Sequence, residues 1–86
     1  MPVLSHFLGI IITMYFNDHN PPHFHAKYNE YRAEIAISNL SVKEGNLPPR
    51  ILGLVMEWAE LHKQDLMNNW ILLKETGNYE QIEPLI

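Results

Sequence analysis

Residues 15–28 contain the densest group of chemically active side chains in this sequence. Three of the five histidines, His19, His23 and His25, lie there together with Asp18. His23 and His25 are two residues apart, so on a strand both rings point to one face with Cα atoms roughly 6.5–7 Å apart. Both can then reach one metal ion, with His19 or Asp18 as a third ligand. Two histidines and a carboxylate suit Zn²⁺, Fe²⁺, Ni²⁺ or Mn²⁺ and leave coordination positions open.

The same histidines also suit acid–base chemistry without a metal. Paired imidazoles that titrate near neutral pH can cleave a phosphodiester when cations and a phenol flank them, as in a small ribonuclease. Lys27, Arg32 and Tyr28 are the flanking groups. The candidate functional site is therefore Asp18, His19, His23, His25, Lys27 and Arg32.

A purely structural interpretation of the histidines remains open beside these two. His-x-His is a short pattern that also arises by chance. In this interpretation His25 hydrogen-bonds the turn at residues 17–18, and His23 covers the edge of the sheet. Asn and Asp make local hydrogen bonds to the backbone, and Asn20 before Pro21 is held in an extended conformation, so the same loop also forms a rigid corner.

Composition excludes several classes of protein and of site. With 86 residues we expect one domain, and with no cysteine any metal must bind through nitrogen and oxygen ligands. The net charge of −4 argues against a duplex-DNA binder. We find neither a signal peptide nor a membrane span, and therefore expect a soluble, cytoplasmic protein.

Four segments are predicted to be strands of an antiparallel sheet. Residues 10–16 are rich in β-branched and aromatic side chains and are expected to form the central strand. Residues 23–28 alternate, with His23, His25 and Lys27 on one face. The two-residue connection Asn29-Glu30 predicts a hairpin with residues 31–37, and residues 42–44 form a short strand. Trailing residues 79–86 can return as an edge strand.

Two helices are predicted after the sheet. Pro48-Pro49 suits a first helical turn, and the apolar stripes carrying Trp58 and Trp70 are out of phase, which predicts a break or bend near Lys63. Gly77 is expected to end the second helix. The fold class is therefore α+β: a three- to four-stranded antiparallel sheet (about 9–45) followed by two C-terminal helices (about 48–76) packed on one face, with a tail at 77–86, in a single domain 1–86.

With these residues placed, the chain resembles the domain of unknown function 4160 family of small bacterial proteins. The specific part is the block Asn-Asp-His-Asn-Pro-Pro-His-Phe-His at residues 17–25, and Glu57-Trp58, His62 and Trp70 agree with it. The resemblance runs nearly end to end but implies no catalytic role for any residue. It implies a place in a two-gene, toxin–antitoxin-like unit beside a short protein of the domain of unknown function 2442 type.

Two functions follow as expectations. The first is a non-enzymatic binding or regulatory component of such a unit, whose open sheet face, with His23, His25, Lys27, Arg32 and Glu34, docks the small protein from the neighbouring gene. A homodimer is also compatible with it. The second is a histidine-centred hydrolase or ribonuclease, with or without a divalent transition metal, and only this function involves RNA. Whether the protein is an enzyme stays open at this point.

Overall fold

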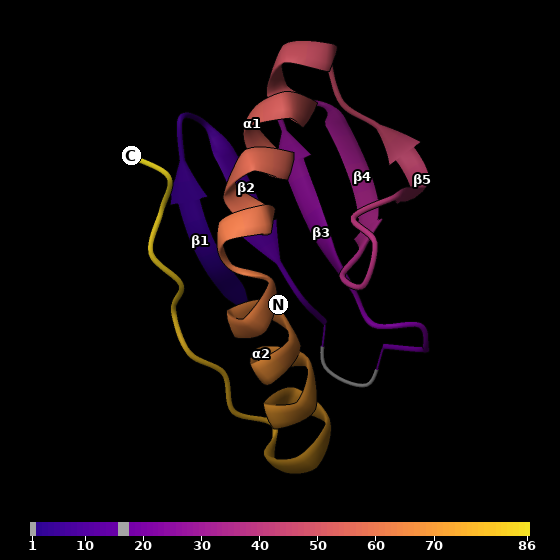
Figure 1. Ribbon diagram of the computed structural model, residues 1–86, viewed down its shortest axis with the longest axis vertical. Coiled ribbons are helices and arrows are strands. Elements are labelled where there is room, and N and C mark those ends of the chain that lie inside the picture. Colours follow the sequence, from indigo (N-terminus) through magenta and orange to yellow (C-terminus); the bar gives the residue numbers. More distant parts are fainter. Residues whose placement is uncertain (1, 16–17) are drawn as a thin grey trace.

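Five antiparallel strands precede two helices in the computed structural model, which describes residues 2–15 and 18–86 (Figure 1). The strands form one sheet in the order β1-β2-β3-β4-β5, so each strand pairs with its neighbour in sequence. The α+β class and the two C-terminal helices are confirmed, whereas the sheet has five strands and not three to four. The strands are β1 (Val3–Phe7), β2 (Ile10–Thr13), β3 (His23–Tyr28), β4 (Tyr31–Ala36) and β5 (Val42–Asn46).

The additional strand is β1, which lies before the predicted start of the sheet at residue 9. It pairs with β2 through a register shift between Val3 and Ser5, so Leu4 and Ser5 are both buried and the period-2 signal is lost. Because β1 occupies one edge, β3 and not β2 is the central strand. β2 ends at Thr13, and the end of the predicted strand at Phe16 lies outside the described residues.

The hairpin of β3 and β4 has the predicted two-residue connection. Tyr28 pairs with Tyr31, and Asn29 takes a φ of 53°, a conformation that Asn adopts more readily than most residues. β5 follows at the far edge. Gly45 is required there, because it has a φ of +78° and a Cβ would lie 2.2 Å from the carbonyl oxygen of Arg32.

The helical region breaks where the sequence predicts. α1 (Pro49–Leu61) begins at the second proline of the pair, and α2 (Lys63–Thr76) follows after the single residue His62. Gly77 ends α2 in the left-handed conformation, with a φ of 77°, and its N–H donates to the Leu73 carbonyl at 3.0 Å. Among the described residues, neither helix has the length and apolar character needed to span a bilayer.

α1 packs across one face of the sheet, α2 continues past the lower ends of the strands, and both helices contribute side chains to the core (Figure 1). Trp58 of α1 is fully buried, with its ring centroid 5.5 Å from that of Phe7 and 6.1 Å from that of Phe24. Trp70 of α2 is also buried, which confirms the assignment of both tryptophans to the core. The Trp58 indole therefore connects the edge strand β1 with the central strand β3 in the core.

The C-terminal tail does not form the edge strand that its sequence allows. It runs beside β1 as an extended segment (Figure 1), and a single backbone hydrogen bond, from the Ile82 N–H to the Leu4 carbonyl at 2.8 Å, joins the two. Its other contacts use side chains: Gln81 Nε2 donates to the Val3 carbonyl at 2.8 Å, and Trp58 Nε1 donates to the Glu83 carbonyl at 2.8 Å. The tail thus covers the β1 edge without extending the ladder.

Replacing Trp58 with Ala should lower the free energy of unfolding by about 3–5 kcal/mol, because the large side chain is fully buried and its loss leaves a cavity. Ile71→Ala is the matched control, since Ile71 is 47% exposed on α2 and its truncation should change stability by about 0.5 kcal/mol or less. Chemical denaturation measures both. Equal midpoints for the two variants would contradict the central place of Trp58 in the core.

Candidate metal centre

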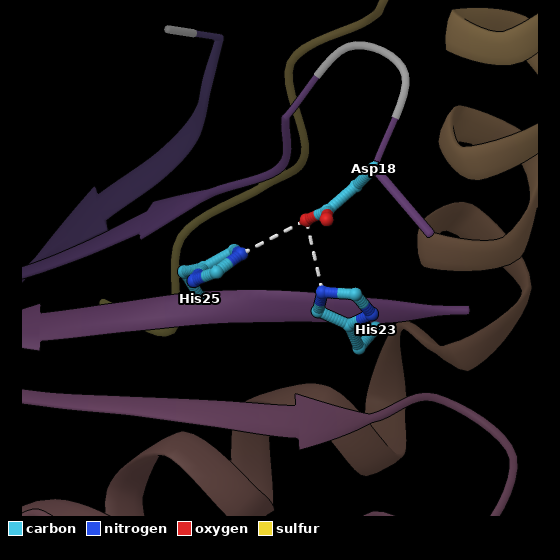
Figure 2. A group of neighbouring side chains, drawn as sticks. All are labelled: Asp18, His23 and His25. Carbon is cyan, nitrogen blue, oxygen red and sulfur yellow. Dashed lines mark hydrogen bonds and ion pairs between the residues drawn. The ribbon is translucent and has the colours of Figure 1, made fainter. Parts of the chain in front are cut away.

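Three of the predicted site residues converge on one point. Asp18 lies in the segment between β2 and β3, and its Oδ2 atom is 2.9 Å from Nε2 of His23 and 3.2 Å from Nε2 of His25 (Figure 2). One ligand-type atom from each residue lies within 4.8 Å of the other two. Ligand atoms about 2.1 Å from a shared ion are about 3.0–3.4 Å apart at octahedral or tetrahedral angles, and the distances from Asp18 Oδ2 to the two imidazole nitrogens are close to that range.

β3 positions the two histidines. Its alternation places Phe24 and Ala26 in the core beneath the helices and directs His23 and His25 to the opposite face. His23 begins the strand, and its ring centroid is 5.4 Å from that of Trp70. Its side chain is therefore only 1% exposed, although it stands on the polar face.

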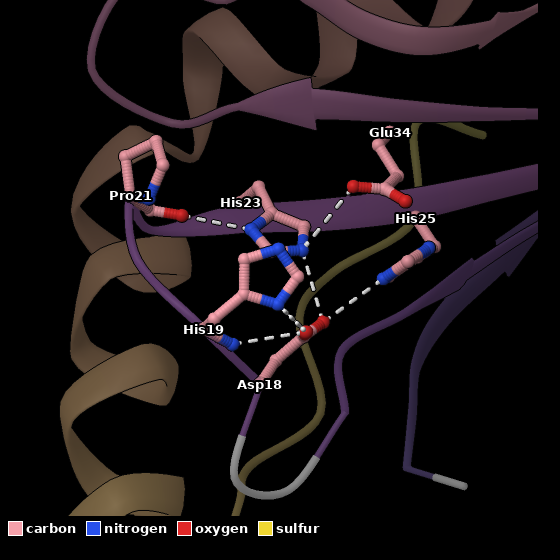
Figure 3. A network of polar contacts seen from close by, with 6 residues as sticks. All are labelled: Asp18, His19, Pro21, His23, His25 and Glu34. Carbon is pink, nitrogen blue, oxygen red and sulfur yellow. Dashed lines mark hydrogen bonds and ion pairs between the residues drawn. The ribbon is translucent and has the colours of Figure 1, made fainter.

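The proline corner before β3 orients the His23 ring. The Asn20–Pro21 peptide bond is cis, and the loop is joined to the sheet by the Ile37 N–H, which donates to the Pro22 carbonyl at 3.1 Å. Nδ1 of His23 is 2.8 Å from the Pro21 carbonyl oxygen, which can only accept, so Nδ1 carries the proton and donates. Nε2 is left to face Asp18 (Figure 3).

Nε2 of His23 is a buried polar atom that lacks a hydrogen bond. Its 2.9 Å approach to Asp18 does not have hydrogen-bond angles, and no other described residue supplies a partner. With Nδ1 protonated, a neutral ring presents its Nε2 lone pair to a carboxylate oxygen, which is unfavourable. A proton on Nε2 or a cation between the two atoms removes the conflict, and buried polar atoms are nearly always satisfied in some such way.

His25 completes the group from a more open position. Its side chain is 22% exposed, and its Nε2 makes a hydrogen bond with Asp18 Oδ2 at 3.2 Å. The Tyr15 ring packs edge-on against the imidazole, with centroids 4.3 Å apart. The structural interpretation therefore predicted this His25 contact correctly, but His23 lies on the central strand rather than over a sheet edge.

The Asp18 carboxylate is held in its charged form. Burial acts to raise its pKa, but hydrogen bonds from the His25 side chain and the His19 N–H, together with the charges of His23 and His25, outweigh burial and lower the pKa below its ordinary value. Asp18 is thus ionised at neutral pH, which is the form in which a carboxylate binds a metal.

His19 and Glu34 surround this group without belonging to it (Figure 3). The His19 side chain is 83% exposed, and its Nδ1 is 3.3 Å from Asp18 Oδ1, so of the two alternatives for a third ligand the structure places Asp18 in the cluster. Glu34 Oε1 lies 3.5 Å from His23 Nε2. Strand alternation predicts Glu34 on this face, and the hairpin register, which pairs His25 with Glu34, is the sequence signal for its place beside the histidines.

The remaining candidates divide between the two faces of the sheet. Lys27 and Arg32 pair directly across β3 and β4 and stand on the open face with His25. Tyr28 is on the opposite face and packs against the core. The phenol proposed to assist phosphodiester cleavage is therefore separated from the histidines by the sheet, which removes one element of the metal-free acid–base arrangement.

The comparisons with known proteins agree with the family resemblance. Residues 9–71 match the model of a family described as a domain of unknown function, DUF4160. The match contains Asp18, His23, His25 and Glu34, but not β1 or the C-terminal tail. No curated protein and no solved structure shows a significant match to the chain.

The tautomer of His23 is directly measurable. In metal-free protein, long-range ¹H–¹⁵N correlation spectra should show a protonated Nδ1, because that atom donates to the Pro21 carbonyl at 2.8 Å. His6, which is exposed on β1, is the internal comparison and should exchange its ring protons faster. A neutral His23 protonated at Nε2 alone would contradict the orientation described for this ring.

Proposed function

Because the chain belongs to the DUF4160 family, a domain of unknown function, we propose its function from the site itself: it binds one divalent transition-metal ion through Asp18, His23 and His25. The family match shows a domain of unknown function, and the cluster is a group of side chains able to hold a metal. The proposal goes further: these three side chains bind a metal ion when the protein functions.

The unsatisfied Nε2 atom of His23 carries the proposal. It is buried, it faces an ionised carboxylate at 2.9 Å, and the atom across the ring is already committed to the Pro21 carbonyl. Metal-binding histidines commonly donate their second ring N–H to a backbone carbonyl, which selects the tautomer and orients the ligand nitrogen. His23 has both features: Nδ1 donates to the Pro21 carbonyl, and Nε2 is directed toward Asp18.

The ligand set limits the metal and its chemistry. Two imidazoles and one carboxylate favour Zn²⁺, Fe²⁺, Ni²⁺ or Mn²⁺ over Ca²⁺ and Mg²⁺, which prefer all-oxygen sites. Three protein ligands leave positions for water or a further ligand, and a bound ion supplies Lewis acidity there. Glu34, 3.5 Å from His23 Nε2, can approach as an additional ligand or as an acceptor from bound water. Hydrolysis of a phosphodiester at this site stays a prediction.

Equilibrium dialysis against Zn²⁺, Ni²⁺ and Mn²⁺ should load about one ion per chain, and Asp18→Asn should weaken binding by more than the roughly 10–100-fold typical for losing a residue that only orients a ligand. The amide keeps the carboxylate's shape and removes its charge. His6→Ala is the matched control, because His6 is an exposed histidine on β1 outside the cluster, and it should leave metal content unchanged.

A second readout separates metal loss from misfolding. Metal added at about 100 times its Kd should raise the unfolding free energy by about 2.7 kcal/mol in the wild type, and a chelator should reverse the gain. The double variant His23→Ala, His25→Ala should show no such gain, and circular dichroism establishes whether it is folded. The same metal content in this folded variant and in the wild type would overturn the proposed function.

A protein partner is the second candidate, and the exposed edge of the sheet favours it. All five residues of β5 are exposed, and this strand pairs with β4 alone, whereas the tail covers the opposite edge. An exposed edge strand offers unpaired N–H and C=O groups to an added strand. The partner we propose is the small protein from the neighbouring gene that the family resemblance suggests.

Co-expression of the two genes should yield a complex that survives purification. Val42→Asp on β5 should weaken it, because Val42 is an exposed apolar side chain at that edge. Leu61→Asp is the control, since Leu61 is likewise exposed but lies at the end of α1. A complex that Leu61→Asp disrupts and Val42→Asp does not would place the partner on the helices instead.

A further inference from the structure

The open face of the sheet has two adjoining cavities, of about 220 and 240 Å³, that meet beside the metal ligand His25. Tyr15, His25 and Arg32 line both. The first cavity continues over Ile11 and Lys27 on one side, and the second continues over acidic side chains on the other. Any molecule in the first cavity therefore lies next to the proposed metal.

Charge on this face is divided between two rows. Lys27 lies directly opposite Arg32, and one pair further along the ladder Glu34 lies opposite Glu44. Like charges directly opposite each other destabilise a sheet. Among the described residues no carboxylate forms an ion pair with Lys27 or Arg32. The acidic row, Glu34 and Glu44, adjoins the metal ligands and suits a cation. The basic row, Lys27 and Arg32, has no counter-charge in the described part of the chain, and a bound anion would supply one.

The wall of the first cavity is mostly apolar apart from this basic row. Val3, Ile11 and Ala26 contribute to it, and Thr13, Tyr15 and His25 add a few polar groups. A volume of about 220 Å³ corresponds to about seven waters at roughly 30 Å³ each, so the cavity has room for a small molecule. An apolar wall with a few convergent charges is typical of a ligand site.

We propose that this cavity binds a small oxyanion on an apolar body, a carboxylate or a phosphate monoester, beside the metal. The oxyanion pairs with Arg32 and Lys27, since a guanidinium holds either group through two parallel hydrogen bonds and an ammonium adds a point charge. The apolar body lies against Ile11 and the other wall residues. His25 is two residues before Lys27, so a short ligand spans from the cations to the ion. This inference rests on the proposed function only where it places the ligand beside the metal, because the oxyanion itself is held by Arg32 and Lys27.

Calorimetric titration of Zn²⁺-loaded protein with benzoate and with phenyl phosphate tests the proposal, with neutral benzamide as the uncharged probe. Either anion should bind, and the comparison shows which oxyanion the site prefers. The double variant Lys27→Gln, Arg32→Gln should bind at least roughly tenfold more weakly, because charge-assisted hydrogen bonds are lost. Lys43→Gln, which removes an exposed cation of β5 outside both cavities, should bind as the wild type does.

Zn²⁺ content, measured on every variant, keeps the two proposals separate. An unchanged Zn²⁺ content together with weaker anion binding in the Lys27, Arg32 double variant supports the cavity assignment. Benzamide binding as tightly as benzoate, equal affinity in the double variant, or no binding of either anion to Zn²⁺-loaded wild type overturns it. Wild-type protein that loads no Zn²⁺ but still binds the anions through Lys27 and Arg32 would overturn the metal proposal and leave the oxyanion site standing.

Discussion

The alternation of side chains along β3 is the constraint on which the fold and the site both depend. As the central strand, β3 must bury Phe24 and Ala26 under the helices, and the same period of two sends His23, His25 and Lys27 to the other face. A slip of one residue would bring two imidazoles into the core and expose a phenylalanine. The packing that stabilises the domain therefore also fixes the spacing of the two histidines of the candidate metal centre.

Burial of His23 distinguishes this site from two histidines on a polar surface. The loop from Asp18 to Pro22 folds over the end of β3, and Trp70 packs against the ring from α2, so the imidazole is enclosed on an otherwise open face. Enclosing it requires that both nitrogens be satisfied. The Pro21 carbonyl accepts a hydrogen bond from Nδ1. Nε2 faces Asp18 and needs a proton or a cation to satisfy it.

Much of this arrangement follows from local rules and could be predicted. The Asn29-Glu30 connection sets the register of β3 and β4, the out-of-phase tryptophans predict the break at His62, and Gly77 stops α2. The misses are contacts between distant segments. The bulge in β1 removes the alternation that would predict a strand. The tail joins β1 through one backbone and one side-chain hydrogen bond, and the choice of Asp18 over His19 depends on how the loop closes. Local patterns carry no information about such closures.

The segments outside the family match explain how one edge of the sheet is protected. β1 and the tail flank the matched residues 9–71, and they meet through the Ile82 N–H and the Leu4 carbonyl. Without them β2 would be the exposed edge, and its Ile10 and Ile12 side chains would lose part of their cover. With them, the site strand β3 is flanked by two strands on each side, and the only uncovered edge among the described strands is polar β5. β4 lies between the exposed edge strand β5 and the strand β3 that carries His23 and His25. A strand added at that edge and an ion held by Asp18, His23 and His25 would therefore occupy different parts of one sheet.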